Sequence, residues 1–237
     1  MPRRAPTRFM PSALGLAAAL GLARGPALSG HVRAQDGADL GHERARRVAA
    51  QVQAFHDQTT TLRTAFTQVH VHRAYGRTTR SRGLLTVQRP GKLRFDYLGG
   101  DLRVIASDGR SLVAYEPTED GRGQVLRRSL EDATVPSALA VLTGQARLDR
   151  DFRFRLVDPA RFRWDGPVLE IRPVRAEPAY RRVFLHVDPS LSGVVRRVIV
   201  QDHEGNLNRF DFRRMTFDRP VDDTWFTFVT PPGAREL

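Results

Sequence analysis

The sequence predicts a mainly β protein of the α+β class, with a large curved antiparallel sheet and helices over its concave face. Three observations support this prediction. Segments that alternate apolar and polar residues recur about every ten residues from position 62 onward, with Gly, Pro, Asp or Asn between them. Helical patterns occur only at residues 39–58 and 136–142. Large apolar side chains occupy alternate strand positions, so one sheet face is strongly apolar.

Residues 1–34 have the pattern of a secretory signal peptide. Three arginines precede an apolar run at residues 13–23, and Val32 and Ala34 supply small side chains at the two positions that a signal peptidase recognises. The run is too short to span a membrane, which takes about 20 apolar residues. We therefore expect cleavage, leaving residues 35–237 as a single domain. The segment holds five arginines and no acid, so its removal lowers the formal net charge from +12 to +7.

The chain has no cysteine, so it has no disulfide framework and no cysteine for lipidation. Together with the leader, this predicts a soluble protein of the bacterial periplasm. Its positive charge is carried by dispersed arginines that alternate with apolar residues, as in residues 152–156. The alternation is typical of a solvated sheet face. Export argues against a nucleic-acid partner and leaves attraction to anionic lipid headgroups as the functional alternative.

The first predicted element after a polar tail to about residue 37 is the helix at residues 39–58. Val48, Val52 and Phe55 are spaced i, i+4 and i+7, which places one apolar stripe on a polar helix. Such a helix must lie across an apolar surface.

Strands follow this helix, and hairpin turns are predicted at residues 107–109 and 203–206. The predicted strands are residues 62–72, 81–88, 92–97, 102–107, 111–116, 124–128, 152–157, 168–173, 182–187, 194–202, 207–217 and 226–230.

The second predicted helix, at residues 136–142, interrupts the strands. It has proline in its first turn, and Gly144 lies just past its end. Leu139 and Leu142 are spaced i, i+3 and give it an apolar side.

Residues 83–97 contain two alternating strands around a Pro-Gly turn, with Arg89 where the first strand ends. Leu93 and Phe95 share one face, and Phe66 lies on a preceding strand. Aromatic stripes at strand spacing are most often ordinary core. A sheet too large for two helices to fill would instead leave a cavity, and half-open barrels of this size can hold an apolar ligand.

Sequence motifs for catalysis are absent. No glycine-rich phosphate loop follows a strand, and there is no nucleophile elbow and no H-E-x-x-H motif. His70 and His72 would share a strand face, but no third ligand has a suitable spacing. We expect neither an enzyme nor a metal or cofactor site.

Several segments, in a shared order, resemble the family of periplasmic outer-membrane lipoprotein carriers, LolA. The first is Thr64-Ala65-Phe66-Thr67-Gln68 after the amphipathic helix, and the second is the block at residues 83–97 with Arg89-Pro90. Residues 105–115, the helix at 136–144, the hairpin at 202–206 and the C-terminal residues 226–233 follow in family order.

The resemblance implies an incomplete β-barrel lidded by two or three helices, whose cavity takes the acyl chains of lipoproteins. It implies a monomeric carrier that receives cargo from an inner-membrane ABC transporter and passes it to an outer-membrane acceptor, without catalytic residues. It also implies that Arg89 bonds to backbone carbonyls of the lid helix and keeps the empty cavity closed. Guanidinium suits this role because it stays charged and offers five donors. The implied cavity or lid contacts are Val48, Val52, Phe55, Phe66, Leu93, Phe95, Leu139 and Leu142.

Two departures concern the cargo. Phe95 stands where the family commonly has tryptophan, and Leu93 where phenylalanine is frequent. A carrier of a free lipid or glycolipid is therefore one alternative, and a lipoprotein-sensing regulatory module on the same fold is another. Such sensors usually carry further domains or a membrane anchor, which favours the carrier.

Overall fold

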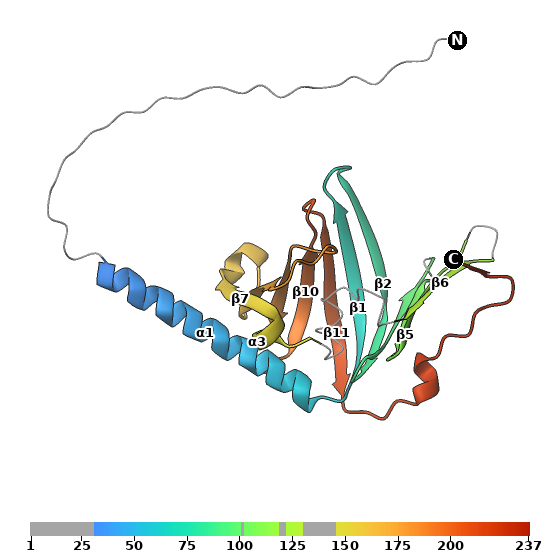
Figure 1. Cartoon of the computed structure of the whole chain (residues 1–237), viewed down its shortest axis with the longest axis horizontal. Coiled ribbons are helices and arrows are strands. Elements are labelled where there is room, and N and C mark those ends of the chain that lie inside the picture. Colours follow the sequence, from blue (N-terminus) through green and yellow to red (C-terminus); the bar gives the residue numbers. More distant parts are fainter. Residues whose placement is uncertain (1–30, 101, 119–121, 130–145) are drawn as a thin grey trace, which may run out of the picture.

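The computed structural model of the chain describes residues 31–100, 102–118, 122–129 and 146–237, with side chains from residue 39 onward (Figure 1). A 12-stranded open sheet forms the body, and helix α1 lies along one end of it. This confirms the predicted mainly β class. Within the described residues, no helix has both the length and the apolar character that crossing a membrane requires.

Helix α1 (His31–Gln58) ends where the sequence predicts but begins earlier. Residues 31–37, which we expected to form a polar tail, are helical. Ala, Arg and Gln are strong helix formers, and they accommodate one glycine at a cost of about 1 kcal/mol. Three β-branched threonines follow Gln58, and the first strand begins at Thr61.

The strands pair in chain order except at two places, where β1 lies next to β11 and β12 lies next to β6. All pairs are antiparallel apart from β12 and β6, which are parallel. The two sheet edges are β12 and β7, and the sheet does not close. The strands are β1 (Thr61–His72), β2 (Arg77–Gln88), β3 (Lys92–Leu98), β4 (Val104–Asp108), β5 (Ser111–Glu116), β6 (Gln124–Ser129), β7 (Phe152–Val157), β8 (Val168–Pro173), β9 (Arg182–Val187), β10 (Val195–Gln201), β11 (Leu207–Phe217) and β12 (Arg235–Glu236).

The strand predicted at residues 226–230 is wrong. A 3-10 helix, η2 (Asp223–Phe226), occupies the start of this segment, and Asp222 caps it by accepting a hydrogen bond from Thr224 N at 2.8 Å. Two prolines follow at residues 231–232, and proline has no N–H for a strand ladder. The aromatic residues that suggested a strand are explained in part by the burial of Phe226, which does not belong to a paired strand.

Two short helices complete the described elements, α3 (Leu148–Asp151) and the 3-10 helix η1 (Pro159–Phe162). The helix predicted at residues 136–142, with Leu139 and Leu142, lies outside the described residues.

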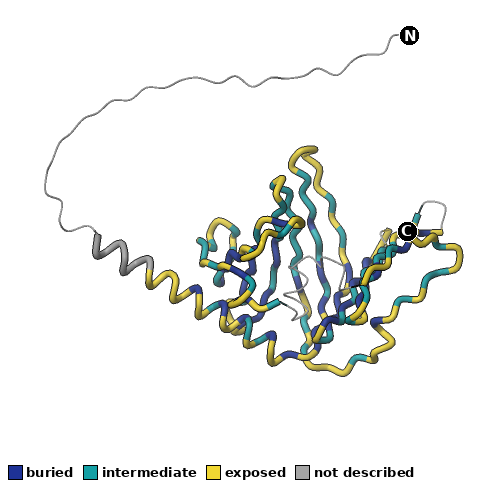
Figure 2. The backbone as a smooth tube through the Cα atoms, in the orientation of Figure 1, coloured by how far each residue is buried: buried dark blue, intermediate teal, exposed yellow. Residues whose placement is uncertain are grey.

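The main core lies on the sheet face that α1 covers, which we call the inner face (Figure 2). Its strand residues alternate with the arginine-rich residues of the opposite, outer face. Helix α1 contributes Ala45, Ala49 and Val52 to this core. On the outer face, Phe162 and Trp164 cover a smaller cluster around Val168.

The alternating arginines lie on the outer face, as predicted, and part of them pair with acids. Glu170 is buried and accepts hydrogen bonds from Arg172 Nε at 2.6 Å and Arg155 Nη2 at 2.7 Å. Burial acts to raise the pKa of Glu170, but these two hydrogen bonds outweigh it and hold the pKa below its ordinary value. Glu170 is therefore charged in the folded protein.

Candidate functional site

Five aromatic residues from three strands meet on the inner face and form what we call the aromatic cluster. The ring of Phe66 on β1 lies 5.4 Å from Phe95 and 5.2 Å from Tyr97, both on β3. On its other side lies Phe210 of β11, at 6.0 Å, which stacks on Phe212 at 6.4 Å. Edge-to-face pairs at these separations stabilise beyond the area they bury. The cluster forms an apolar floor on the inner face that extends from β3 across β2 and β1 to β11.

Gly83 makes the contacts across β2 sterically allowed. Strand β2 separates β1 from β3, and Gly83 pairs with both Phe66 and Tyr97. A Cβ at Gly83 would lie 2.6 Å from two ring carbons of Phe66 and 2.3 Å from the carbonyl oxygen of Asp96. The missing side chain leaves the space into which the Phe66 ring extends.

A cavity of about 420 Å³ adjoins the aromatic cluster, which is within the usual range for ligand pockets. We call it the inner-face cavity. Phe95, Tyr97 and Phe210 line it together with Ile105 and Val200. Apart from Ala179, its remaining lining is polar and comes from Gln68, His70, Arg103, Tyr180, Asp202, Asn206 and Asn208.

Helix α1 packs small side chains against the inner face at the end of the sheet formed by β7 and β8. Ala45, Ala49 and Val52 are almost completely buried, and Val48 packs against the same core. Phe55 lies further along, where its ring meets Phe217 edge-on at 5.1 Å. The stripe is therefore one of small and branched residues, and Phe55 contacts the end of β11 rather than the aromatic cluster.

A second cavity, of about 730 Å³, lies between α1 and the edge strand β7. We call it the helix-side cavity. Its apolar lining is Ala49, Ala50, Ala54, Phe152 and Phe154, and its polar lining is His42, Arg46, Gln53, Asp57, Arg147, Asp149 and Arg153.

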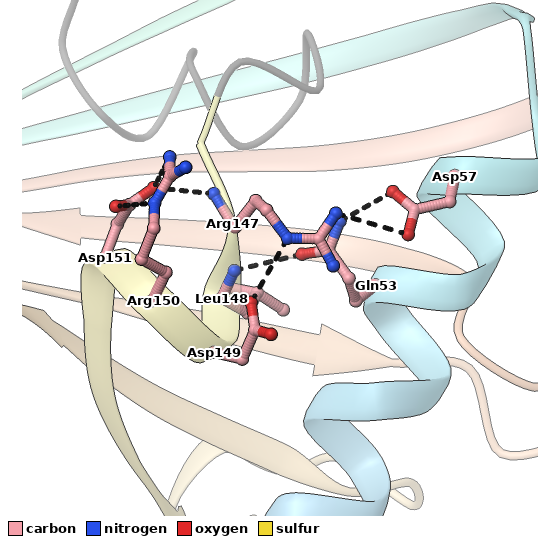
Figure 3. Close-up of polar contacts among 7 residues, drawn as sticks. All are labelled: Gln53, Asp57, Arg147, Leu148, Asp149, Arg150 and Asp151. Atoms are coloured by element: carbon pink, nitrogen blue, oxygen red, sulfur yellow. Dashed lines mark hydrogen bonds and ion pairs between the residues drawn. The ribbon is translucent and has the colours of Figure 1, made fainter.

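A polar clamp fixes α3 to α1 at one end of the helix-side cavity (Figure 3). Gln53 on α1 accepts a hydrogen bond from Leu148 N at 3.0 Å and donates to Asp57 Oδ1 at 2.8 Å. The guanidinium of Arg147 lies between Asp57 at 3.6 Å and Asp149 at 3.4 Å. The clamp holds the chain where it enters β7.

Arg89 lies at the turn between β2 and β3 and binds the link between α1 and β1. Its Nη1 donates to the carbonyl of Thr59 at 2.6 Å, and its backbone N donates to the carbonyl of Thr60 at 2.9 Å. Burial lowers the pKa of Arg89, an effect that Asp218 and Asp57 oppose. Asp218 also accepts from Thr60 N at 2.8 Å, so two charged side chains hold this link.

The structure brings most of the predicted contact residues together. Val52, Phe66, Leu93 and Phe95 are buried in the main core, and Val48 packs against it. The predicted contact of Arg89 with the lid helix, like Leu139 and Leu142, lies outside the described residues.

The His70 and His72 rings lie 3.9 Å apart. The described part of the chain holds no group of three or more side chains placed to bind a metal ion.

Sequence reasoning missed Ala45 and Ala49, because small residues carry little hydropathy signal even at helical spacing. It missed Gly83 as a packing position, since a glycine in a strand pattern shows its neighbours only in three dimensions. The clamp joins Gln53 to Leu148 and Asp57 to Arg147. These residues are far apart in sequence, and no local pattern marks their contact.

Two sequence comparisons, with family models and with curated proteins, give the same family. The sequence model described as outer membrane lipoprotein carrier protein LolA matches residues 57–229. An outer-membrane lipoprotein carrier protein of Bordetella avium is 28% identical over 230 residues, covering 96% of this chain and 97% of the relative. One from Nitrosospira multiformis is 25% identical over 184 residues, covering 77% and 84%. A solved LolA superfamily structure from Nitrosomonas europaea has 15% identity and a TM-score of 0.44, covering 78% of this chain and 97% of that one.

Proposed function

The chain belongs to the family of outer membrane lipoprotein carrier proteins, LolA, and on this basis we propose that it is a soluble periplasmic carrier of acylated lipoproteins. Cargo leaves an inner-membrane ABC transporter, travels with its acyl chains against the inner face, and is passed to an outer-membrane acceptor. The carrier acts as a monomer after removal of residues 1–34. It performs no chemical step and needs no cofactor.

One observation carries the proposal: an aromatic floor spanning three strands adjoins a cavity on the inner face. Phe66, Phe95 and Phe210 are apolar and come from both halves of the sheet. Two of these rings, Phe95 and Phe210, also line the inner-face cavity, and polar groups form most of its remaining wall. Acyl chains can pack against the aromatic rings. The polar groups can form hydrogen bonds with the ester and amide groups that join acyl chains to a protein.

The energetics favour a carrier that both loads and unloads. Moving a 16-carbon chain out of water contributes roughly 12 kcal/mol, at about 0.8 kcal/mol per methylene. A bilayer is equally apolar, so this term nearly cancels when cargo moves between a membrane and the carrier. Small differences in how tightly the inner face closes then set the direction of transfer.

Arg89 is proposed as the latch of the closed state, with Leu139 and Leu142 as its lid contacts. Its bond to the Thr59 carbonyl supports part of this role, because it ties the β2–β3 turn to the end of α1. A hydrogen bond to a charged group contributes about 1.5–3 kcal/mol. That magnitude biases a closed state and still allows cargo to reverse it.

Native mass spectrometry of protein purified from the periplasm tests the proposal. We expect a bound triacylated lipoprotein, released when a detergent competes for the cavity. A bound free lipid or glycolipid would reassign the protein to the first alternative. A protein that never holds an apolar ligand, even from lipoprotein-overproducing cells, would contradict both carrier functions.

A matched pair of variants tests whether the ligand detected by mass spectrometry is bound at the inner face. Phe210→Arg places a charge in the wall of the inner-face cavity and should abolish the cargo peak. Phe228→Arg changes a ring that packs on Tyr115, away from that wall, and should retain the peak. Equal loss from both variants would contradict the assignment to the inner face.

A further inference from the structure

The outer face carries a patch of exposed arginines and exposed apolar side chains, which we call the outer patch. It comprises Arg63, Arg82, Leu84, Leu98, Arg213 and Trp225. We propose that the outer patch docks the protein on a bilayer surface that contains anionic phospholipids. This interaction is separate from whatever the inner face binds.

Strand register places the patch residues side by side. Ala65 on β1 pairs with Leu84 on β2 and with Arg213 on β11, so these three share one row across the sheet. In the next row, Arg82 pairs with Leu98 on β3. Paired residues project to the same face, and neighbouring strands are about 4.8 Å apart. Phe66, next to Ala65, projects to the opposite, inner face.

Trp225 forms the aromatic part of the patch. It follows Asp223 in η2 and lies against the sheet between two arginines, with Arg63 5.7 Å and Arg94 5.3 Å from the ring centroid. The Trp225 carbonyl accepts a hydrogen bond from Arg94 Nη1 at 3.2 Å. Even so, 44% of Trp225 is exposed, as is 47% of Leu84. A large aromatic ring held open to solvent on a basic face needs a partner that is apolar and anionic.

Within the described residues, no acid forms an ion pair with the patch arginines. Arg80 and Arg214 beside them are exposed and likewise form no ion pair in that part of the chain. The nearby acids are engaged elsewhere, since Asp96 pairs with Arg94 at 2.8 Å and Asp211 with Arg209 at 2.9 Å. This excess of cations is complementary to a surface of phosphate headgroups.

The composition of the patch suits a bilayer surface. Arg63, Leu84 and Trp225 line a depression of about 350 Å³, and Leu98 lies beyond it, paired with Arg82. Tryptophan and arginine at headgroup depth, with single leucines reaching the acyl boundary, are typical of peripheral membrane contact.

Vesicle binding tests the proposal directly. The exported full protein should bind phosphatidylcholine vesicles containing phosphatidylglycerol, bind pure phosphatidylcholine weakly, and dissociate as salt screens the charges. A triple variant, Arg63→Gln with Arg82→Gln and Arg213→Gln, should bind about 100-fold more weakly, at about fivefold per arginine. Its matched control, Arg44→Gln with Arg46→Gln and Arg47→Gln, removes the same charge from α1 and should stay within about threefold.

Fluorescence locates the contact. The chain has two tryptophans, so in the Trp164→Phe background all tryptophan emission comes from Trp225. Brominated phospholipid should quench that emission on binding. Equal losses from both triple variants, no binding to anionic vesicles, or binding without quenching would each overturn the proposal. The triple patch variant could instead keep binding vesicles and lose binding to an acidic acceptor protein. That result would assign the patch to a protein partner and would also overturn the proposal.

Discussion

Gly83 shows how one residue without a side chain determines the aromatic cluster. The Phe66 ring occupies the space above it, and backbone closes the other side, so neither neighbour can withdraw without disturbing the sheet. Gly83→Ala should lower the free energy of unfolding by about 1–3 kcal/mol, as overpacking of a filled core does. Urea denaturation measures this.

Gly100→Ala is the control for replacing a glycine by alanine, because a Cβ at Gly100 meets no atom within 4 Å and the backbone there has no positive φ. A Gly83→Ala variant that is as stable as the wild type would show that Phe66 is free to move away.

Arg89 is the residue whose proposed role involves motion. Arg89→Leu removes the bond to the Thr59 carbonyl and retains an apolar stem, so it should speed cargo release about 10-fold or more and change uptake less. Release to acceptor vesicles, followed by stopped flow with labelled lipoprotein, measures both rates. Arg110→Leu, an exposed arginine in the next hairpin, is the control. Equal release rates for Arg89→Leu and wild type would contradict the latch.

His186 makes stability depend on pH. It is fully buried on the outer face, against Phe162 at 5.0 Å and Trp164 at 5.4 Å. Burial, and then the charge of Arg197, lower the pKa of His186 to about 4, which Asp211 partly opposes.

Between the ordinary pKa of 6.5 and about 4, the unfolded chain therefore binds more protons at this position. The free energy of unfolding should fall by up to about 3 kcal/mol as pH drops through this window. His186→Phe should remove that slope in urea titrations, and an unchanged slope would contradict the assignment.

At the scale of elements, α1 and α3 are held together by few polar contacts. Gln53→Ala leaves the Leu148 N–H without its acceptor and frees Asp57 from its donor, which should cost about 1–2 kcal/mol and loosen α3 before the sheet unfolds. Hydrogen exchange of Leu148 measures this opening. Gln51→Ala, at an exposed neighbouring position, should leave that exchange rate unchanged. Equal exchange in both variants would show that the clamp contributes nothing.

Local periodicity predicts most elements of this fold because sheet residues must alternate. Strand bounds at residues 111–116 and 207–217 agree with the structure, since turn residues interrupt the pattern at both ends. Prediction from periodicity fails where buried residues do not recur at a regular spacing. Phe226 is buried beneath a 3-10 turn, and its neighbours imitate a strand. Helix α1 also begins before its apolar stripe, where no core contact marks its start.

At the scale of the site, the sequence predicts which residues face inward but not which of them contact each other. Phe66 and Phe95 are recognisable as inward-facing from their strands alone. Their contact crosses β2, where Gly83 leaves room for the Phe66 ring. The contact of Phe66 with Phe210 depends on the pairing of β1 with β11, which joins residues about 150 apart in sequence. Long-range pairing leaves no local signal, so the cluster becomes visible only in the folded sheet.

For the whole molecule, the open sheet separates two surfaces with different chemistry. The inner face is apolar and aromatic, while the outer face carries arginines, part of them paired with acids such as Glu170. Alternate residues of each strand point to opposite faces. Substitutions can therefore change the apolar inner face without changing the charge of the outer face, and the reverse.

The central claim is that acyl chains lie against the inner face. Site-specific photocrosslinking tests it most directly, with a photoreactive phenylalanine analogue at Phe210 in the cavity wall or at Leu84 on the outer face. With acylated lipoprotein loaded, we predict crosslinks to the acyl chains from position 210 and none from position 84. Acyl crosslinks from position 84, or none from position 210 while cargo is bound, would contradict the account.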